Sequence, residues 1–117
     1  MFSLIFLYLS KKNSGVSDTR NYAIKYIKGK YVNFLDSDDK WDDDALEKGY
    51  NMLESNDDID FVSYRIKFFE RKTGYHHLDY KFDGDYVVNL NESIDKIQLS
   101  SASILFRSSL FKKYNYD

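Results

Sequence analysis

The 117-residue sequence contains no cysteine and no proline. Without cysteine the chain has no disulfides, no zinc-thiolate site and no thiol nucleophile, and a reducing cytoplasm suits it. A basic surplus is also missing, because 17 Lys and Arg stand against 19 Asp and Glu, for a formal net charge of −2. Domains that bind nucleic acid usually carry such a surplus, so we expect no nucleic-acid partner. The lack of proline has no physical explanation beyond composition bias.

Long hydrophobic runs are absent as well. The apolar stretch at the N-terminus, residues 1–10, is shorter than the roughly 20 residues that a membrane-spanning helix needs. It also lacks the preceding positive charge and the following small-residue cleavage site of a signal peptide. We interpret Leu4 to Leu9 as a buried strand. The 18% aromatic residues are spread along the chain, which favours core packing over a platform for sugar rings.

The first half of the chain shows a strand, helix and strand pattern. After Leu4 to Leu9, Ser17 or Asp18 is predicted to cap a helix that ends at about Lys28. Tyr31 to Leu35 follows as a second apolar strand. This is the pattern of a βαβ unit, whose two strands run parallel. It predicts an α/β fold with a mostly parallel central sheet flanked by helices.

Further helices and strands are predicted in the second half of the chain. One of Asp42 to Asp44 caps the next helix, and Asp44 with Glu47 has the spacing of a capping box. The further predicted elements are the end of that helix near Ser55, a strand at Ile59–Tyr64, a hairpin within Arg65–Phe82, a turn at Phe82–Tyr86, a short helix at Asn91–Ile97, a strand at Ser101–Phe106 and a last helical turn from Ser108 to Tyr114.

Carboxylates gather directly after the second strand, in the sequence Asp36-Ser37-Asp38-Asp39. Ligands of open α/β sheets bind beyond the carboxyl ends of the strands. Two carboxylates one residue apart can both reach a divalent cation, and Mg²⁺ or Mn²⁺ prefers such oxygen ligands. A cation held there can neutralise a diphosphate leaving group. The pattern therefore predicts a metal and diphosphate site.

Two simpler interpretations compete with this site. The first is a solvated loop that caps the next helix, and we assign that role to Asp42–Asp44 because acidic side chains favour a helix N-terminus. It suits Asp36 and Asp38 less well, since a carboxylate that ends an apolar strand is costly without a partner. The second is an EF-hand calcium loop. It is excluded because the position that needs glycine holds Trp41, and a strand precedes the loop where the motif needs a helix.

Three ordered segments, Asn13–Asn21, Gly29–Val32 and Phe34–Asp39, resemble the middle of the family 2 glycosyltransferases. The resemblance implies a Rossmann-like GT-A fold, a nucleotide-diphosphate-sugar donor and Mg²⁺ or Mn²⁺ as cofactor. Ser100–Ser103 and Phe106–Arg107 are similar to the acceptor-side segment of relatives that act on bacterial surface glycans. That similarity implies a glycan or a lipid-linked acceptor.

The resemblance also assigns roles to single residues. Asp38 would coordinate the metal, Asp36 would contact the ribose or sugar of the donor and the metal, and Asp39 would assist. The donor-side residues would be Arg20 and Asn21, which match the family's Arg-Asn pair, and Gly15, where a small residue lets the backbone approach the substrate. From the sequence alone, a surface ion pair is an equally good interpretation of Arg20, and core packing is as good as sugar contact for Trp41.

The chain matches only part of the family's domain. The strands of the base-binding half are expected before the matched region, and the usual catalytic base, in a Glu-Asp pair, is expected beyond Asp117. Residues 1–117 are thus expected to form one incomplete GT-A domain with weak or no turnover alone. The alternatives are a non-catalytic module that binds a metal and a nucleotide diphosphate with a partner chain, and a truncated remnant that self-associates through an exposed sheet edge. The expected location is the cytoplasm or the inner face of the membrane.

Overall fold

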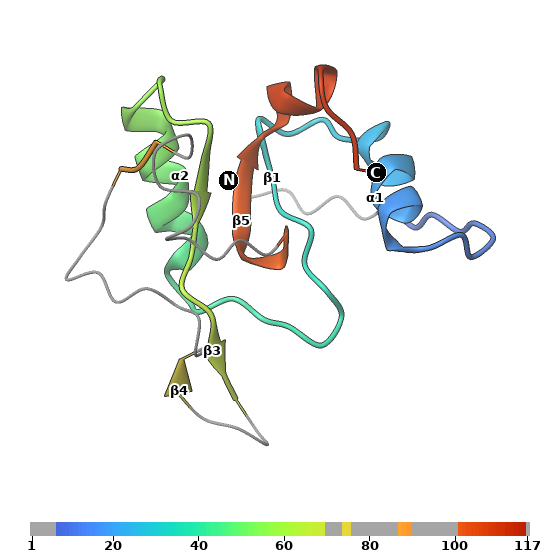
Figure 1. The fold of residues 1–117 in the computed structure, drawn as a ribbon, viewed down its shortest axis with the longest axis horizontal. Helices are drawn as coiled ribbons and strands as arrows, with labels where there is room; N and C mark the ends of the chain where they lie inside the picture. The colour runs from blue at the N-terminus through green and yellow to red at the C-terminus, as the bar shows by residue number, and fades with distance from the viewer. Residues whose placement is uncertain (1–6, 70–73, 76–86, 90–100, 117) are drawn as a thin grey trace.

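The structure is a computed structural model, and Figure 1 shows its fold. It describes residues 7–69, 74–75, 87–89 and 101–116. A three-stranded sheet lies at the centre, formed by β1 (Tyr31–Val32), β5 (Ile104–Arg107) and β2 (Phe61–Ser63) in the order β1-β5-β2. The strand that comes last in the chain therefore lies between two strands that come much earlier.

Both neighbouring pairs in this sheet are antiparallel. Tyr31 of β1 lies opposite Arg107, and Val62 of β2 lies opposite Leu105. Because β1 and β2 both run against β5, they run parallel to each other. Helix α2 (Ala45–Ser55) connects them. The described residues thus contain a βαβ unit, but its two parallel strands are separated by β5.

The α/β class is therefore confirmed, whereas the predicted parallel pairing of neighbouring strands is not seen in the described part of the chain. The predicted first strand, Leu4–Leu9, falls mainly outside the described residues, and Leu7–Leu9 are not in a strand. The first strand of the predicted βαβ unit thus stays untested over Leu4 to Phe6. The unit that the structure contains uses the strand after Lys30 and the strand before Tyr64.

Helix α1 (Val16–Ile24) begins and ends differently from the prediction. Its N-cap position is Gly15, which has a φ of 97° and makes no side-chain cap, so the predicted cap at Ser17 or Asp18 is wrong. The carboxylate of Asp18 instead accepts a hydrogen bond from the Ser14 hydroxyl. The helix also stops before Lys28, because the next amides bond only three residues back, as in Tyr26 N–H to Ala23 C=O at 3.0 Å.

Helix α2 packs on the sheet and supplies the centre of the core. Its Leu53 is fully buried and packs with Val62 of β2 and Leu105 of β5. Gly49 is buried in the same helix, and a Cβ atom there would collide with the Tyr64 ring. Asp44 occupies the predicted N-cap position but makes no side-chain cap, since its carboxylate pairs with Lys48 at 2.9 Å. This small core fixes β1, β2 and β5 together.

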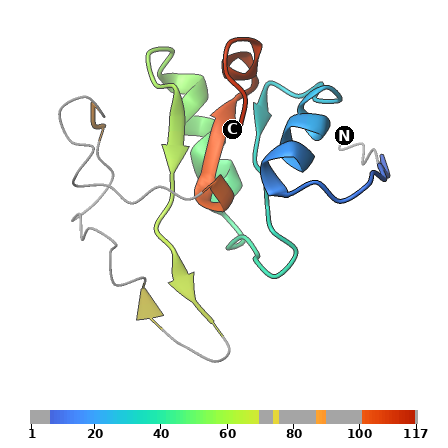
Figure 2. The same ribbon diagram turned by 45° about the vertical axis from the view of Figure 1, so that its right-hand side comes forward.

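Beyond the central sheet, β3 (Lys67–Phe68) and β4 (Gly74–Tyr75) form an antiparallel pair, which confirms the predicted hairpin over the part that is described. Figures 1 and 2 show this pair standing apart from the sheet. The predicted elements at Phe82–Tyr86 and Asn91–Ile97 lie outside the described residues.

The end of the described chain contains two 3-10 helices. One of them, η2 (Ser101–Ser103), replaces the first half of the predicted strand, and β5 continues to Arg107. The other, η3 (Ser108–Lys112), provides the predicted last helical turn but without a side-chain cap at Ser108. The Ser108 hydroxyl instead donates to the Gly29 carbonyl at 2.5 Å. It thereby ties the end of β5 to the segment that leads into β1.

Arg107 joins three parts of the fold. Its guanidinium donates to the carbonyls of Leu53 and Asn56 at the end of α2, at 2.6 and 2.7 Å. It also donates to the carbonyl of Ile59, ahead of β2, at 2.6 Å. The last carbonyls of a helix have no partner within the helix. One arginine on β5 therefore satisfies the C-terminal end of α2 and holds it against the sheet.

Candidate active site

The acidic segment lies on a tight turn at the carboxyl end of β1. The Asp39 N–H donates to the Asp36 carbonyl at 3.0 Å, which closes the turn. Asp36, Asp38 and Asp39 are all exposed. The structure thus confirms that the carboxylates follow β1, and it presents them to solvent on one short loop, which we call the acidic turn (residues 36–39).

Asn33 anchors the chain just before the acidic turn. Its side-chain amide nitrogen donates to the carbonyls of Ala102 and Ile104, both at 2.9 Å. Its side-chain oxygen accepts a hydrogen bond from the Trp41 indole N–H at 3.1 Å. Asn33 and Trp41 flank the acidic turn, so this contact closes its base. Because the Asn33 side chain occupies carbonyls of η2 and β5, β1 ends at Val32 and not at Leu35 as predicted.

Sequence reasoning missed Asn33 as a site residue. The sequence did contain a signal, because Asn33 carries the one amide side chain in the apolar run Tyr31–Leu35. A polar side chain that becomes partly buried needs hydrogen-bond partners. The structure shows the packing contacts of Trp41. Its ring packs edge-on against Tyr64 with 4.7 Å between the ring centres, and its N–H bonds to Asn33. Trp41 thus makes the packing contacts of one of its two interpretations, and sugar contact by this partly buried side chain stays a prediction.

Arg20 reaches the acidic turn from α1. Its guanidinium lies 3.4 Å from the Asp36 carboxylate, and its side chain is only 17% exposed, against 51% for Asp36. The Tyr116 ring covers it, with 5.2 Å between the guanidinium carbon and the ring centre. Two residues that the sequence placed in separate motifs thus meet in space.

Asn21 and Gly15 are not brought to the carboxylates in this way. The Asn21 side chain faces the backbone of Tyr116, donating to its carbonyl at 2.6 Å and accepting from its N–H at 2.8 Å. Gly15 stands at the start of α1 with open space where a Cβ would be. Its positive φ is one that side-chain-bearing residues rarely adopt. The predicted donor contacts of both residues stay predictions.

Negative charge accumulates on the acidic turn. The pKa of the Asp39 carboxyl is raised above its ordinary value, first by partial burial and then by the charges of Asp38 and Asp36. Within the described residues, Arg20 is the only cation paired with the turn, and it pairs with Asp36. Carboxylates held this close repel one another, and a bound cation would relieve that repulsion.

Comparison with protein families decides what kind of chain this is. The sequence profile described as glycosyl transferase family 2 matches residues 2–114, which is nearly the whole chain. The chain belongs to glycosyltransferase family 2. Membership of that family implies a GT-A fold. No solved structure gives a significant match.

Several curated glycosyltransferases are similar to this family 2 chain. The minor teichoic acid biosynthesis protein GgaB of Bacillus subtilis is 33% identical over 95% of the chain, which spans 12% of GgaB. The putative teichuronic acid biosynthesis glycosyltransferase TuaG of Bacillus subtilis is 44% identical over 48% of the chain and 23% of TuaG. An uncharacterized glycosyltransferase of Methanocaldococcus jannaschii, MJ1057, is 28% identical over 92% of the chain and 37% of its own length. The chain thus spans a small part of each relative.

The divalent cation that the sequence predicts would need oxygen ligands from the acidic turn. The described residues contain no cluster of three or more acidic or histidine side chains that could hold a metal by themselves. Mg²⁺ is usually bound through one or two carboxylates, with water and substrate phosphates as its other ligands. The turn offers three exposed carboxylates, of which Asp36 pairs with Arg20. Asp36 and Asp38 therefore carry oxygen atoms of the kind that such a cation takes as ligands.

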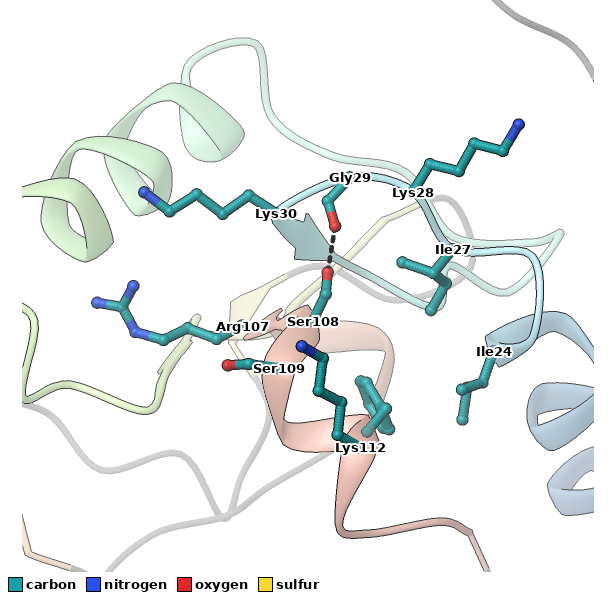
Figure 3. Close-up of a pocket in the computed structure, with 10 residues that line it drawn as sticks. Ile24, Ile27, Lys28, Gly29, Lys30, Arg107, Ser108, Ser109 and Lys112 are labelled. Atoms are coloured by element: carbon teal, nitrogen blue, oxygen red, sulfur yellow. Dashed lines mark hydrogen bonds between the residues drawn. The ribbon is translucent and has the colours of Figure 1, made fainter.

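A second feature of this family 2 chain lies at the other end of β1. A cavity of about 490 Å³ opens between the end of α1 and η3, and four cationic side chains line it. Figure 3 shows Lys28 extending away from the cavity and Lys112 folded across Ser109. Lys30 pairs with Glu54 at 3.1 Å, and Arg107 is bonded to backbone carbonyls. We call this region the basic cavity. Two of its four cations already serve the fold.

No helix in the described part of the chain is long and apolar enough to cross a lipid bilayer.

Proposed function

We propose that the acidic turn binds the diphosphate of a nucleotide-diphosphate sugar together with Mg²⁺ or Mn²⁺, and that the protein containing this chain transfers the sugar to a glycan or lipid-linked acceptor of a cell-surface polymer. The observation that carries the proposal is the meeting of Arg20 and Asp36 at the carboxyl end of β1. Family membership supports glycosyl transfer, and the names of two relatives, which concern teichoic and teichuronic acid biosynthesis, support the acceptor class.

In this proposal each side chain of the turn has a distinct task. Asp38, exposed at the tip of the turn, supplies a carboxylate oxygen to the cation, and Asp36 contacts the ribose or the sugar of the donor. The cation, when bound, would offset the charge that develops on the departing diphosphate. Asp39 adds negative charge that strengthens the attraction for the cation.

Arg20 holds Asp36 in place and adds a fixed positive charge beside the diphosphate. A guanidinium is planar and always charged, so it suits both a carboxylate and a phosphate. The acceptor hydroxyl must lose a proton during transfer. We assign that step to no described residue.

Titration calorimetry of the purified chain with MnCl₂ and uridine diphosphate tests the proposal. We expect Asp38→Asn to weaken binding of the metal-diphosphate pair by about 100-fold, because loss even of groups that only support metal ligands costs tenfold to 100-fold. Asp43→Asn is the matched control, since Asp43 is exposed in the acidic segment that leads into α2. Equal affinities for wild type and Asp38→Asn would refute the metal site.

The same protein separates catalysis from binding. Incubation with a uridine-diphosphate sugar and Mn²⁺, followed by chromatography of the products, measures hydrolysis and transfer. We expect binding with little turnover by this chain alone. Turnover that Asp38→Asn abolishes would contradict that expectation and would show that the chain is sufficient for catalysis.

A further inference from the structure

The chain after η3 returns to α1 and docks on it. The carbonyl and the N–H of Tyr116 both bond to the side chain of Asn21, at 2.6 and 2.8 Å. An asparagine side chain carries one acceptor and one donor group side by side, so it can pair with a backbone unit as a neighbouring strand would. Figure 1 shows the C-terminal end lying beside α1. Asn21 thus fixes residue 116 at one place along the helix.

The partly buried Tyr116 side chain is in contact with aromatic rings and with Arg20. Phe34 meets it edge-on with 5.4 Å between ring centres, and Phe111 stacks on it at 6.3 Å. The Tyr116 hydroxyl is buried and has no hydrogen-bond partner in the described part of the chain. The ring, and not the hydroxyl, is therefore the part of Tyr116 that makes useful contacts.

Arg20 needs such support. An ion pair with a carboxylate that is half exposed is weak by itself, and a free arginine side chain has many conformations. A guanidinium held over the ring of a partly buried tyrosine has fewer conformations open to it and gains cation–π attraction. The Tyr116 ring thus selects the conformation in which Arg20 reaches Asp36.

We propose that Tyr116 is a positioning residue of the donor site: its ring orients Arg20 toward the acidic turn, and Asn21 serves to lock the Tyr116 backbone in register. The proposal rests on the proposed function, because it gives Arg20 its role beside the diphosphate. It also links the segment from β5 through η3, which resembles the acceptor side of the family, to the donor side.

Three substitutions separate the ring from the hydroxyl and from general packing. Tyr116→Leu keeps an apolar side chain and removes the aromatic face. Tyr116→Phe keeps the face and removes the unpaired hydroxyl. Tyr114→Leu is the matched control, because Tyr114 is nearby but 65% exposed. For binding of Mn²⁺ and uridine diphosphate, we expect about fivefold weaker affinity in Tyr116→Leu. We expect less than about twofold change in the other two.

A double-mutant cycle distinguishes positioning from a purely structural role. If Tyr116 acts through Arg20, Tyr116→Leu should change the affinity by less than about twofold when Arg20 is already alanine. An equal fivefold loss in both backgrounds would mean that the ring acts by packing alone, and would overturn the proposal. Thermal unfolding of each variant confirms that it is folded at the temperature of the titration.

A measurement without ligand keeps this proposal separate from the proposed function. The NMR signal of the Arg20 Nε–H group should carry a ring-current shift in wild type and in Tyr116→Phe, and should move toward the random-coil position in Tyr116→Leu. If wild type binds no metal and diphosphate, the proposed function fails while this signal still tests the contact. An Arg20 signal that Tyr116→Leu leaves unchanged would refute the positioning role.

Discussion

The two ends of β1 carry opposite charges that are used in different ways. At the carboxyl end, three exposed carboxylates share one ion pair, between Asp36 and Arg20, within the described residues. At the amino end, the basic cavity contains four cations, but Arg107 is bonded to three carbonyls and Lys30 to Glu54. Within the described residues, Asp38 and Asp39 therefore have no ion pair, and we propose these groups for ligand binding. At the basic end, two of the four cations are held by the fold, and we interpret the Arg107 contacts as a structural joint.

Removing Arg107 is the strongest test of the structural interpretation of the basic end. Arg107→Ala should lower the free energy of unfolding by about 3 kcal/mol, because three backbone carbonyls lose a charged donor. Urea unfolding, followed by circular dichroism, measures the loss.

Two further variants serve as comparisons for the loss of stability in Arg107→Ala. Arg107→Lys keeps the charge, but a single ammonium group cannot reach all three carbonyls, so most of the loss should remain. Lys112→Gln removes a cation from the same cavity and should change the stability by less than about 0.5 kcal/mol. If Arg107→Ala were as stable as Lys112→Gln, the basic end would not be a structural joint, and a ligand-binding role for it would gain support.

The stability of the acidic turn should depend on the uncharged side chain of Asn33. Asn33→Ala should cost about 2 kcal/mol, because it leaves the Trp41 N–H and the carbonyls of Ala102 and Ile104 without their partner. The chain contains one tryptophan, so its fluorescence reports this site directly. We expect a red shift of the emission in native buffer and weaker binding of Mn²⁺ and uridine diphosphate.

Asn33→Asp gives a control for the same position. It keeps an acceptor for the Trp41 N–H but places a charge against the two carbonyls. It should therefore be at least as unstable as Asn33→Ala while changing the Trp41 emission less. Wild-type emission together with wild-type affinity in Asn33→Ala would show that the turn needs no such anchor.

The smallest expected effect concerns the charge of Asp39. Because the pKa of Asp39 is raised, the folded state holds this proton more tightly than the unfolded state. The carboxyl therefore costs stability as the pH rises from below its ordinary pKa through the raised value. Asp39→Asn removes that cost. We expect a Tm gain of at most about 2 °C at pH 7, since solvent screens most of the repulsion at this exposed position.

Measuring Tm at several pH values checks the sign of this effect. The gain in Asp39→Asn should shrink as the pH falls from the raised pKa toward the ordinary value near 4, and should vanish once the wild-type carboxyl is protonated in both states. Saturating Mn²⁺ should also reduce the gain, because a bound cation relieves the same repulsion. A Tm lower than that of wild type at pH 7 would mean that Asp39 makes a stabilising contact.

Local features could be predicted from the sequence. Features that depend on which distant strands pair with one another could not. Apolar runs and charged turns correctly placed α2, the strand before Asp36 and the acidic turn itself. The partner of β1 was not predictable, because β5 comes much later in the chain and its apolar run Ile104–Phe106 does not state which strand it joins. The pairing of Arg20 with Asp36 and the docking of Tyr116 on Asn21 depend on that topology.

The central place of β5 has a consequence for how the protein is made. The two outer strands, β1 and β2, leave the ribosome long before Ile104–Arg107, and neither pairs with the other in the finished sheet. Contacts between distant parts of a chain form late, because the intervening loop must first close. The pairing of β1 and β2 with β5, the anchor of Asn33 on Ala102 and Ile104, and the contacts of Arg107 therefore all require that the chain has been made as far as β5.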